Sequence, residues 1–342
     1  MNKKQEHVPT IRDVAKVARV GLMTVSRVIN NHPSVRISTR KKVEAAIVQL
    51  GYRQNEAARL LKGQRAKLIG LIVPDLSDTF FASCAHTVQQ LARAHGYMTL
   101  VVSSERDPEL EFQEAELMAS RKVSGLLVVT SMSNGDERMS QLQSTGLTIV
   151  AFDRPLPGAD TDCVLVENRS GAEEATQHLI EHGHRRIVCA GYDAETYAVG
   201  ERIMGYIQQM TSAGLKPQVE VGLVTLDDVR QWLTEVWRSK SRPTAIFSLN
   251  HRTSVSMVQA LTELEINIPR DMALVGFDDF DLAAVLSPPL TTVAQSPVEL
   301  ARRSMALLFD RLNAAKDREP SSPAKILLPV KLIVRSSCGT RK

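Results

Sequence analysis

The fold of this chain is decided at residues 10–30, which read TIRDVAKVARVGLMTVSRVIN. Thr10 and Asp13 have the spacing of a capping box, and the carboxylate also complements the positive end of a helix. Apolar residues follow at spacings of three and four over 14–18, so they form a small face on which a second helix can pack. The stretch therefore predicts a short amphipathic helix that begins directly after Thr10.

A second short helix is predicted over residues 22–30, after a glycine-containing break at 19–21. Its apolar residues Val25, Val28 and Ile29 point inward, which leaves polar and basic side chains outward. Two short helices joined by such a turn fit the major groove of duplex DNA. The pattern alone also allows a helical hairpin with a solvated basic face.

A third helix follows, and then one more short helical run. Ser38 or Thr39 can cap the third helix at its start, and Gly51 ends it. Residues 55–62, NEAARLLK, have Asn55 in place as an N-cap. The sequence thus predicts a small, all-helical head.

The charge of this head differs from that of the rest of the chain. Residues 1–65 hold 14 lysines and arginines against four acidic side chains, a net charge of +10. Because the whole chain carries +4, the remainder carries −6. A basic head on an acidic body is typical of a phosphate-binding module joined to a part that avoids DNA.

Length and composition exclude several classes of protein. A chain of 342 residues is too long for one ordinary core, and its 43% hydrophobic and 4% aromatic residues suit a soluble α/β protein. No apolar run reaches the ~18 residues needed to span a bilayer, and residues 1–10 do not read as a secretory signal. The four cysteines show no CxxC spacing, so we expect reduced thiols in a cytoplasmic protein without a membrane partner.

Beyond residue 63, short apolar strands alternate with amphipathic helices. The predicted strands are 68–73, 98–102, 126–130, 148–152, 186–190, 244–248 and 273–277. The predicted helices are 82–95, 109–120, 137–145, 171–181, 200–213 and 253–264. Apolar strands with helical crossovers imply doubly wound parallel sheets, and the two halves imply two lobes with ligands at the carboxyl ends of the strands.

Sequence motifs in both parts resemble those of the LacI/GalR family of bacterial transcription regulators. In the head these are DVAKVARV, TVSRVIN, STRKKVEAAIVQLGY and NEAARLLKG; in the body they include LIGLIVPDLSDTFF, AFDRP, ERIMGY, ALVGFDD and SPPLTTV. The resemblance implies a helix-turn-helix head of three helices with a hinge helix over 1–63. It also implies an effector-binding and dimerisation core over 64–342, similar to periplasmic sugar-binding proteins. By the family's topology the first lobe would be about 66–163 plus 294–324, and the second about 164–293 plus 325–337.

The resemblance also assigns DNA-binding positions. An arginine such as Arg27 can bond guanine with two hydrogen bonds, while leucine and methionine offer apolar contact to a thymine methyl group. Leu61 matches a leucine that wedges into the minor groove, although an ordinary linker leucine is the alternative. Gly21 stands where most relatives have serine. The predicted DNA-binding residues are Thr10, Leu22, Met23, Thr24, Ser26, Arg27, Asn30, Ser34, Arg36, Asn55, Ala58 and Leu61.

A second set of residues matches positions that contact the small molecule in relatives. Aromatic faces beside carboxylates suit a sugar, which presents apolar C–H faces and hydroxyl groups. Arg202 and Asp278 could alternatively form a structural ion pair. His251 stands where the family commonly has Asp, which suggests an anionic effector such as a sugar acid or sugar phosphate. The predicted effector-binding residues are Asp78, Phe80, Phe81, Asp153, Arg202, Asn250 and Asp278.

No motif points to a metal, a cofactor or catalysis. His182 and His184 have no third ligand at a suitable spacing, and the chain contains no GxGxxG, GxxxxGK[ST], GxSxG or HExxH motif. The resemblance implies a repressor that binds a pseudo-palindromic double-stranded operator and responds to a carbohydrate-like effector. A homodimer is favoured over a tetramer because no leucine-heptad tail follows Arg335. A sugar-transport protein or a sugar-processing enzyme with the same core are the rival classes.

Overall fold

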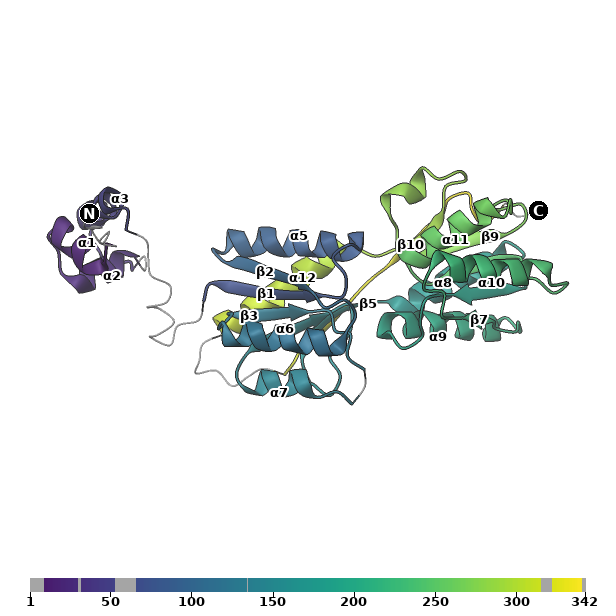
Figure 1. Cartoon of the computed structure of the whole chain (residues 1–342), viewed down its shortest axis with the longest axis horizontal. Coiled ribbons are helices and arrows are strands. Elements are labelled where there is room, and N and C mark those ends of the chain that lie inside the picture. Colours follow the sequence, from purple (N-terminus) through teal and green to yellow (C-terminus); the bar gives the residue numbers. More distant parts are fainter. Residues whose placement is uncertain (1–8, 30–31, 53–65, 134, 315–321, 340–342) are drawn as a thin grey trace, which may run out of the picture. The chain divides into compact units, whose positions relative to one another are not determined.

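The computed structural model describes residues 9–29, 32–52, 66–133, 135–314 and 322–339 (Figure 1). The chain divides into two compact units, Met1–Ala66 and Lys67–Lys342. The first unit is helical and the second is built from parallel sheets, so the predicted α/β fold class with a helix-turn-helix head is confirmed. Among the described residues, no helix is long and apolar enough to cross a membrane.

The first unit contains three helices, α1 (Ile11–Ala18), α2 (Leu22–Ile29) and α3 (Ile37–Leu50). The predicted interaction between Thr10 and Asp13 is present, because the Asp13 carboxylate accepts from the Thr10 backbone nitrogen at 2.8 Å and from Oγ1 at 2.7 Å. This pair fixes where α1 begins.

The three helices share one small core. Val14, Val25 and Val43, one from each helix, have no exposed surface. The third helix begins earlier than the sequence predicted, with Arg36 at the N-cap position and no side-chain hydrogen bond there. The prediction that Ser38 or Thr39 caps it was therefore wrong, because the helix already begins at Ile37 and both residues lie within its first turn.

The second unit contains two six-stranded sheets. In the first, the strand order is β11-β5-β4-β3-β1-β2, and every pair is parallel. The strands are β1 (Leu68–Val73), β2 (Met98–Ser103), β3 (Gly125–Val128), β4 (Thr148–Phe152), β5 (Asp162–Val166) and β11 (Lys325–Leu328). Helices α5 (Thr79–Ala94) and α12 (Pro297–Asn313) cover one face, while α6 (Pro108–Ser120) and α7 (Arg138–Ser144) cover the other.

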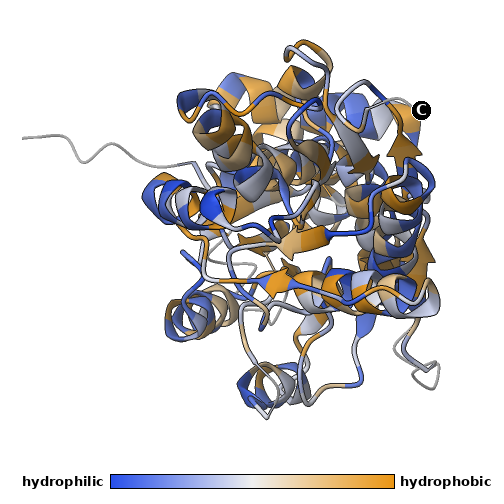
Figure 2. Ribbon diagram, turned by 90° about the vertical axis from the view of Figure 1, so that its right-hand side faces the viewer, coloured by the Kyte–Doolittle hydropathy of each residue, from blue (hydrophilic) through white to orange (hydrophobic). Residues whose placement is uncertain are grey.

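The second sheet has the order β12-β10-β9-β8-β6-β7, and only its edge pair β10·β12 is antiparallel. The strands are β6 (Ile187–Ala190), β7 (Val219–Glu220), β8 (Ala245–Ser248), β9 (Ala273–Phe277), β10 (Thr291–Ala294) and β12 (Lys331–Ile333). Helices α8 (Asn168–Glu181) and α9 (Tyr197–Ser212) pack on one face, and α10 (Leu226–Arg238) and α11 (His251–Glu263) on the other. Apolar residues accordingly gather on the strands and on the helix sides that face them (Figure 2).

The chain passes between the two sheets three times, after β5, after β10 and after β11. Residues 164–166 and 325–328, which the sequence analysis assigned to the second lobe, belong to the first sheet instead. Residues 164–166 pair in register with residues 326–328. The chain therefore leaves this sheet only after the last paired residue of each strand. The predicted boundary at 163/164 therefore cuts through β5, and the one at 324/325 places the whole of β11 in the wrong lobe.

Candidate functional site

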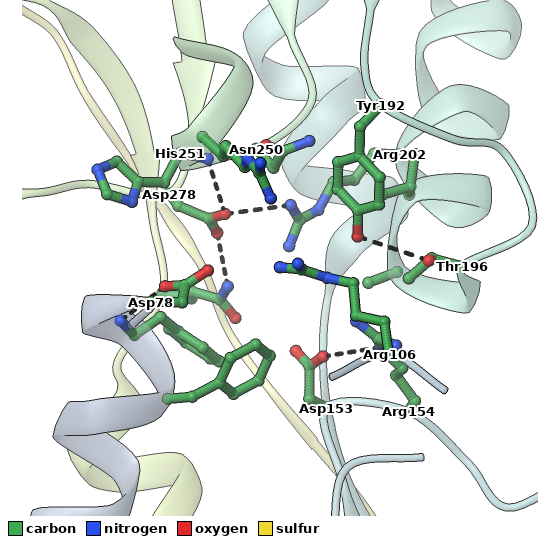
Figure 3. Close-up of a pocket in the computed structure, with 16 residues that line it drawn as sticks. Asp78, Arg106, Asp153, Arg154, Tyr192, Thr196, Arg202, Asn250, His251 and Asp278 are labelled. Carbon is green, nitrogen blue, oxygen red and sulfur yellow. Dashed lines mark hydrogen bonds and ion pairs between the residues drawn. The ribbon is translucent and has the colours of Figure 1, made fainter. Parts of the chain in front are cut away.

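A pocket lies where strands of both sheets end (Figure 3). Its volume is about 50 Å³, which is room for only a few water molecules. The structure brings together at its walls all seven side chains that the sequence analysis assigned to an effector. These are Asp78, Phe80, Phe81, Asp153, Arg202, Asn250 and Asp278.

Three of these residues lie at the start of α5. Asp78 caps the helix, since its Oδ1 accepts a hydrogen bond from the backbone nitrogen of Phe80 at 2.9 Å. Burial raises the pKa of Asp78, and the carboxylate of Asp278 raises it further. The rings of Phe80 and Phe81 meet edge to face at 5.2 Å; Phe81 is buried in the core, while Phe80 stays half-buried at the pocket. This corner thus offers an aromatic face beside a carboxyl group.

Arg202 lies in the second turn of α9, which begins at Tyr197, three residues before the predicted helix start at 200. Its side chain is held on several sides. Nε donates to Asn168 Oδ1 at 2.8 Å, Nη1 donates to the Leu249 carbonyl at 2.6 Å, and Nη1 lies 3.4 Å from Asp278 Oδ2. The residue is only 3% exposed. The ion pair with Asp278 is therefore present, and Arg202 supports the fold as well as lining the pocket.

Asp278 links several elements around the pocket. It follows β9 directly, and besides Arg202 it accepts hydrogen bonds from the His251 backbone nitrogen at 3.2 Å and from Gln295 Nε2 at 2.6 Å. Asn250 caps α11, with its Oδ1 accepting from the Thr253 backbone nitrogen at 2.9 Å. Asn250 lies just past the end of β8, and Asp153 lies just past the end of β4.

Asp153 and Arg154 form a buried pair on the first sheet. Arg154 Nε lies 3.4 Å from Asp153 Oδ2, and Arg154 Nη1 donates to the Thr130 carbonyl at 3.0 Å. Burial raises the pKa of Asp153, although the charges of Arg154 and Arg202 act in the opposite direction. These contacts hold the pair at the end of the first sheet, where Asp153 interacts with the charge of Arg202 from the other half of the unit.

The helical head presents a second candidate surface. Leu22 and Met23 are 46% and 68% exposed, and Arg27 is exposed on the same helix. Thr24 and Ser26 are partly buried between them. These five positions place apolar, hydroxyl and guanidinium groups on α2, the helix that the sequence analysis expected to enter the major groove.

The remaining predicted DNA-binding positions divide into two groups. Thr10 and Arg36 are exposed at the N-cap positions of α1 and α3, and Ser34 is exposed in the turn before α3, where its hydroxyl contacts His32 Nδ1 at 2.8 Å. The other positions lie outside the described residues; they are Asn30, Asn55, Ala58 and Leu61.

Each of the two compact units matches a known protein family. The family described as "Bacterial regulatory proteins, lacI family" matches residues 10–55, and a periplasmic binding protein-like domain matches residues 176–338. The transcriptional regulator DegA of Bacillus subtilis is 32% identical over 96% of this chain and 97% of its own length. This chain belongs to the LacI family. The transcriptional repressor PurR of Haemophilus influenzae is 33% identical over 96% of this chain and 98% of its own.

Solved structures share the fold of this LacI-family chain. The lac repressor dimer bound to operator and the anti-inducer ONPF aligns with a TM-score of 0.83 at 24% identity. The alignment covers 97% of this chain and 99% of the other. The shared fold therefore includes both the helical head and the two-sheet body.

The sequence analysis missed several charged and aromatic residues of this LacI-family pocket. Arg106, Arg154, Tyr192 and Gln295 line it, as does Arg252 beside His251. Each lies within a few residues after a strand or at the first turn of a helix. A rule that searches every such position, rather than only family motifs, would have found them.

Several pocket residues also have unusual backbones. Arg106, Asp153 and Asp278 have φ angles of 61°, 66° and 73°, in the left-handed region that residues with side chains seldom adopt. Such conformations gather at functional sites because the surrounding structure must hold them. In the parts of the chain that are described, no group of His, Cys, Asp and Glu could hold a metal ion.

Proposed function

We propose that this chain is a transcriptional repressor that binds a pseudo-palindromic DNA operator as a homodimer. The observation that carries the proposal is α2, whose exposed face presents Leu22, Met23 and Arg27 on a basic head. Two heads related by a dimer axis would place this helix in successive major grooves about one turn of DNA apart. The names of the relatives, a regulator, a repressor and a repressor–operator complex, support this proposal.

We further infer that a small carbohydrate-like effector in the pocket controls operator binding. The pocket is lined by Phe80, by carboxyl groups and by amides, a combination suited to apolar C–H faces with hydroxyl groups around them. Since its walls come from both sheets, a ligand there would change the angle between them. A coupling of about 1–3 kcal/mol between ligand and operator is typical of such switches.

Selection of bound fragments from sheared genomic DNA, followed by footprinting, tests the first proposal. We expect enrichment of one pseudo-palindromic site, protected over two successive major grooves. Failure to enrich any sequence at moderate salt would contradict the repressor function, whatever the pocket binds. Incubation with candidate sugars separates the rival classes, because a binding protein leaves the sugar unchanged and an enzyme consumes it.

A further inference from the structure

The pocket contains more basic side chains than acidic ones. Four arginines and a histidine line it, against three aspartates. Arg154 and Arg202 are already engaged with Asp153 and Asp278 inside the pocket. The two remaining arginines are Arg106 and Arg252, and within the described ranges Arg252 has no ion pair. Arg106 pairs with Asp75, which lies outside the lining of this pocket, so among the described residues neither arginine is ion-paired with a carboxylate of the pocket walls.

Arg106 is held in a way that directs it into the pocket. It follows β2 in a turn where Glu105 and Arg106 are both left-handed, with φ angles of 53° and 61°. Its Nη1 lies 3.2 Å from Asp75 Oδ2, and its guanidinium lies 5.8 Å from the ring centroid of Tyr192, which follows a strand of the other sheet. Figure 3 shows the guanidinium of Arg106 pointing toward that of Arg202. Two cations that face each other across a pocket favour an anion between them.

Unsatisfied polar atoms gather at the same place. Arg106 Nε and Asn250 Nδ2 are buried donors without a hydrogen-bond partner among the described residues, and Asn250 is only 8% exposed. Arg154 Nε is a third buried donor of this kind, and Gln295 Oε1 is a buried acceptor without a donor. Buried polar groups are nearly always paired, so these atoms indicate a polar ligand that belongs in the pocket. The three donors call for oxygen acceptors on that ligand, and Gln295 Oε1 can accept from one of its hydroxyl groups.

Helix ends add positive potential. α11 begins at His251, and α5 begins at Thr79 next to Phe80, so the positive ends of both helices lie at the pocket wall. Partial positive charge at a helix N-terminus attracts anions. At α5 the carboxylate of the cap Asp78 offsets part of this positive charge. At α11 the cap is Asn250, whose side chain is neutral and leaves the charge in place.

We propose that the effector carries an anionic group, a carboxylate or a phosphate, and that Arg106 is the specificity-determining residue that binds it. This inference rests on the proposed carbohydrate-like effector and names its class, a sugar acid or a sugar phosphate. Arg252 and Asn250 Nδ2 supply further positive charge and a donor. The pocket of about 50 Å³ is too small for a whole sugar, but a cavity of about 1000 Å³ shares Arg106, Arg252 and Asp278 with it, so the rest of the ligand has room beside the anion site.

Thermal unfolding of the full chain with inorganic phosphate, against chloride at equal ionic strength, tests the anion site directly. We expect millimolar phosphate to raise the melting temperature of the wild type, and Arg106→Gln to lose most of that rise. Arg93→Gln, an exposed arginine of α5 outside the pocket, should keep it. An equal rise in all three proteins would overturn the proposal, and so would no rise in the wild type.

Calorimetry with matched ligands then identifies the class. The pairs are glucose with gluconate and glucose 6-phosphate, and ribose with ribose 5-phosphate. We expect an anionic member to bind at least about tenfold more tightly than its neutral parent, and Arg106→Gln to remove that advantage while Arg106→Lys restores part of it. The relative affinities of the wild type for gluconate and for the sugar phosphates show whether the anionic group is a carboxylate or a phosphate. Equal affinity for neutral and anionic members would overturn the proposal and leave the repressor function, tested by DNA selection, intact.

Discussion

Arg311 and Asp162 form a two-contact ion pair, with Arg311 Nε at 2.6 Å from Oδ2 and Nη2 at 2.7 Å from Oδ1 of the aspartate. The same carboxylate accepts from the backbone nitrogen of Ala324 at 2.7 Å. Asp162 begins β5, Arg311 lies in α12 and Ala324 precedes β11. The pair therefore fastens three segments, distant in sequence, at the end of the first sheet opposite to the end where the chain crosses to the second sheet.

Arg311→Met should destabilise the second unit by about 3 kcal/mol, because Asp162 is only 6% exposed and would lose its cationic partner. Urea unfolding followed by circular dichroism measures the change. Arg303→Met is the matched control on α12, since the Arg303 side chain is 56% exposed and its pair with Glu299 should contribute less than about 1 kcal/mol. Similar losses in both variants would show that the Arg311–Asp162 pair has no special role.

Glu111 is a fully buried carboxyl group in α6 whose pKa is raised to about 6. Burial is the main cause, opposed by hydrogen bonds from the Ser131 backbone nitrogen and the Thr130 hydroxyl and by the charge of Arg154. Thr130 in turn accepts from Arg154 through its carbonyl. Glu111 thus supports, from the core, the loop that holds a pocket arginine.

The pH dependence of unfolding tests this carboxyl group. Its ordinary pKa is 4.5, so the folded protein binds the proton more tightly than the unfolded chain does. The free energy of unfolding should therefore fall as pH rises from about 4.5 through 6, by about 2 kcal/mol in total. Glu111→Gln should lack this fall. The difference in the free energy of unfolding between variant and wild type should therefore change by about 2 kcal/mol between pH 4.5 and 6. Parallel pH profiles of the two proteins would contradict the raised pKa.

Much of the fold could be predicted because burial on both sides makes a strand read as a continuous apolar run. Strands β1, β4 and β9 are of this kind, and the predicted ranges match them. The structure also contains elements that the sequence analysis did not name. Strand β7 has two residues, and β10 begins with two threonines, so neither shows an apolar run.

Two further omissions have different physical reasons. α12 carries a start signal, with Ser296 as N-cap, Pro297 in its first turn and Glu299 bonded back to the cap, so closer attention to capping would have found it. The sheet to which β5 and β11 belong could not be predicted in this way. An apolar strand fits either sheet, and only the pairing between these two strands shows that both lie in the first. Arg106 belongs to a loop, where no periodicity marks a residue as functional.

Arg27→Ala should weaken binding to the selected operator by about 1–3 kcal/mol, the usual contribution of an arginine that reads a guanine. Binding to unrelated DNA should change far less. Fluorescence anisotropy with operator and scrambled duplexes measures both. Lys42→Ala is the control, because Lys42 is exposed on α3 and should affect both duplexes alike. An Arg27→Ala variant that loses both affinities equally would assign Arg27 to the phosphate backbone instead.

Gly21→Ser should stabilise the head by a few tenths of a kcal/mol. The carbonyl of Gly21 already accepts from the backbone nitrogens of Thr24 and Val25, at 2.9 and 3.2 Å, so this residue occupies the N-cap of α2. A Cβ built there meets nothing within 4 Å, and a serine hydroxyl would accept a further hydrogen bond from the first turn. Gly51→Ser is the control: its surroundings are equally open, but its φ of +59° should cost about 1 kcal/mol. Amide exchange of residues 1–66 in the full chain, followed during thermal unfolding, measures both changes. Destabilisation by Gly21→Ser would show that the backbone at position 21 needs a glycine.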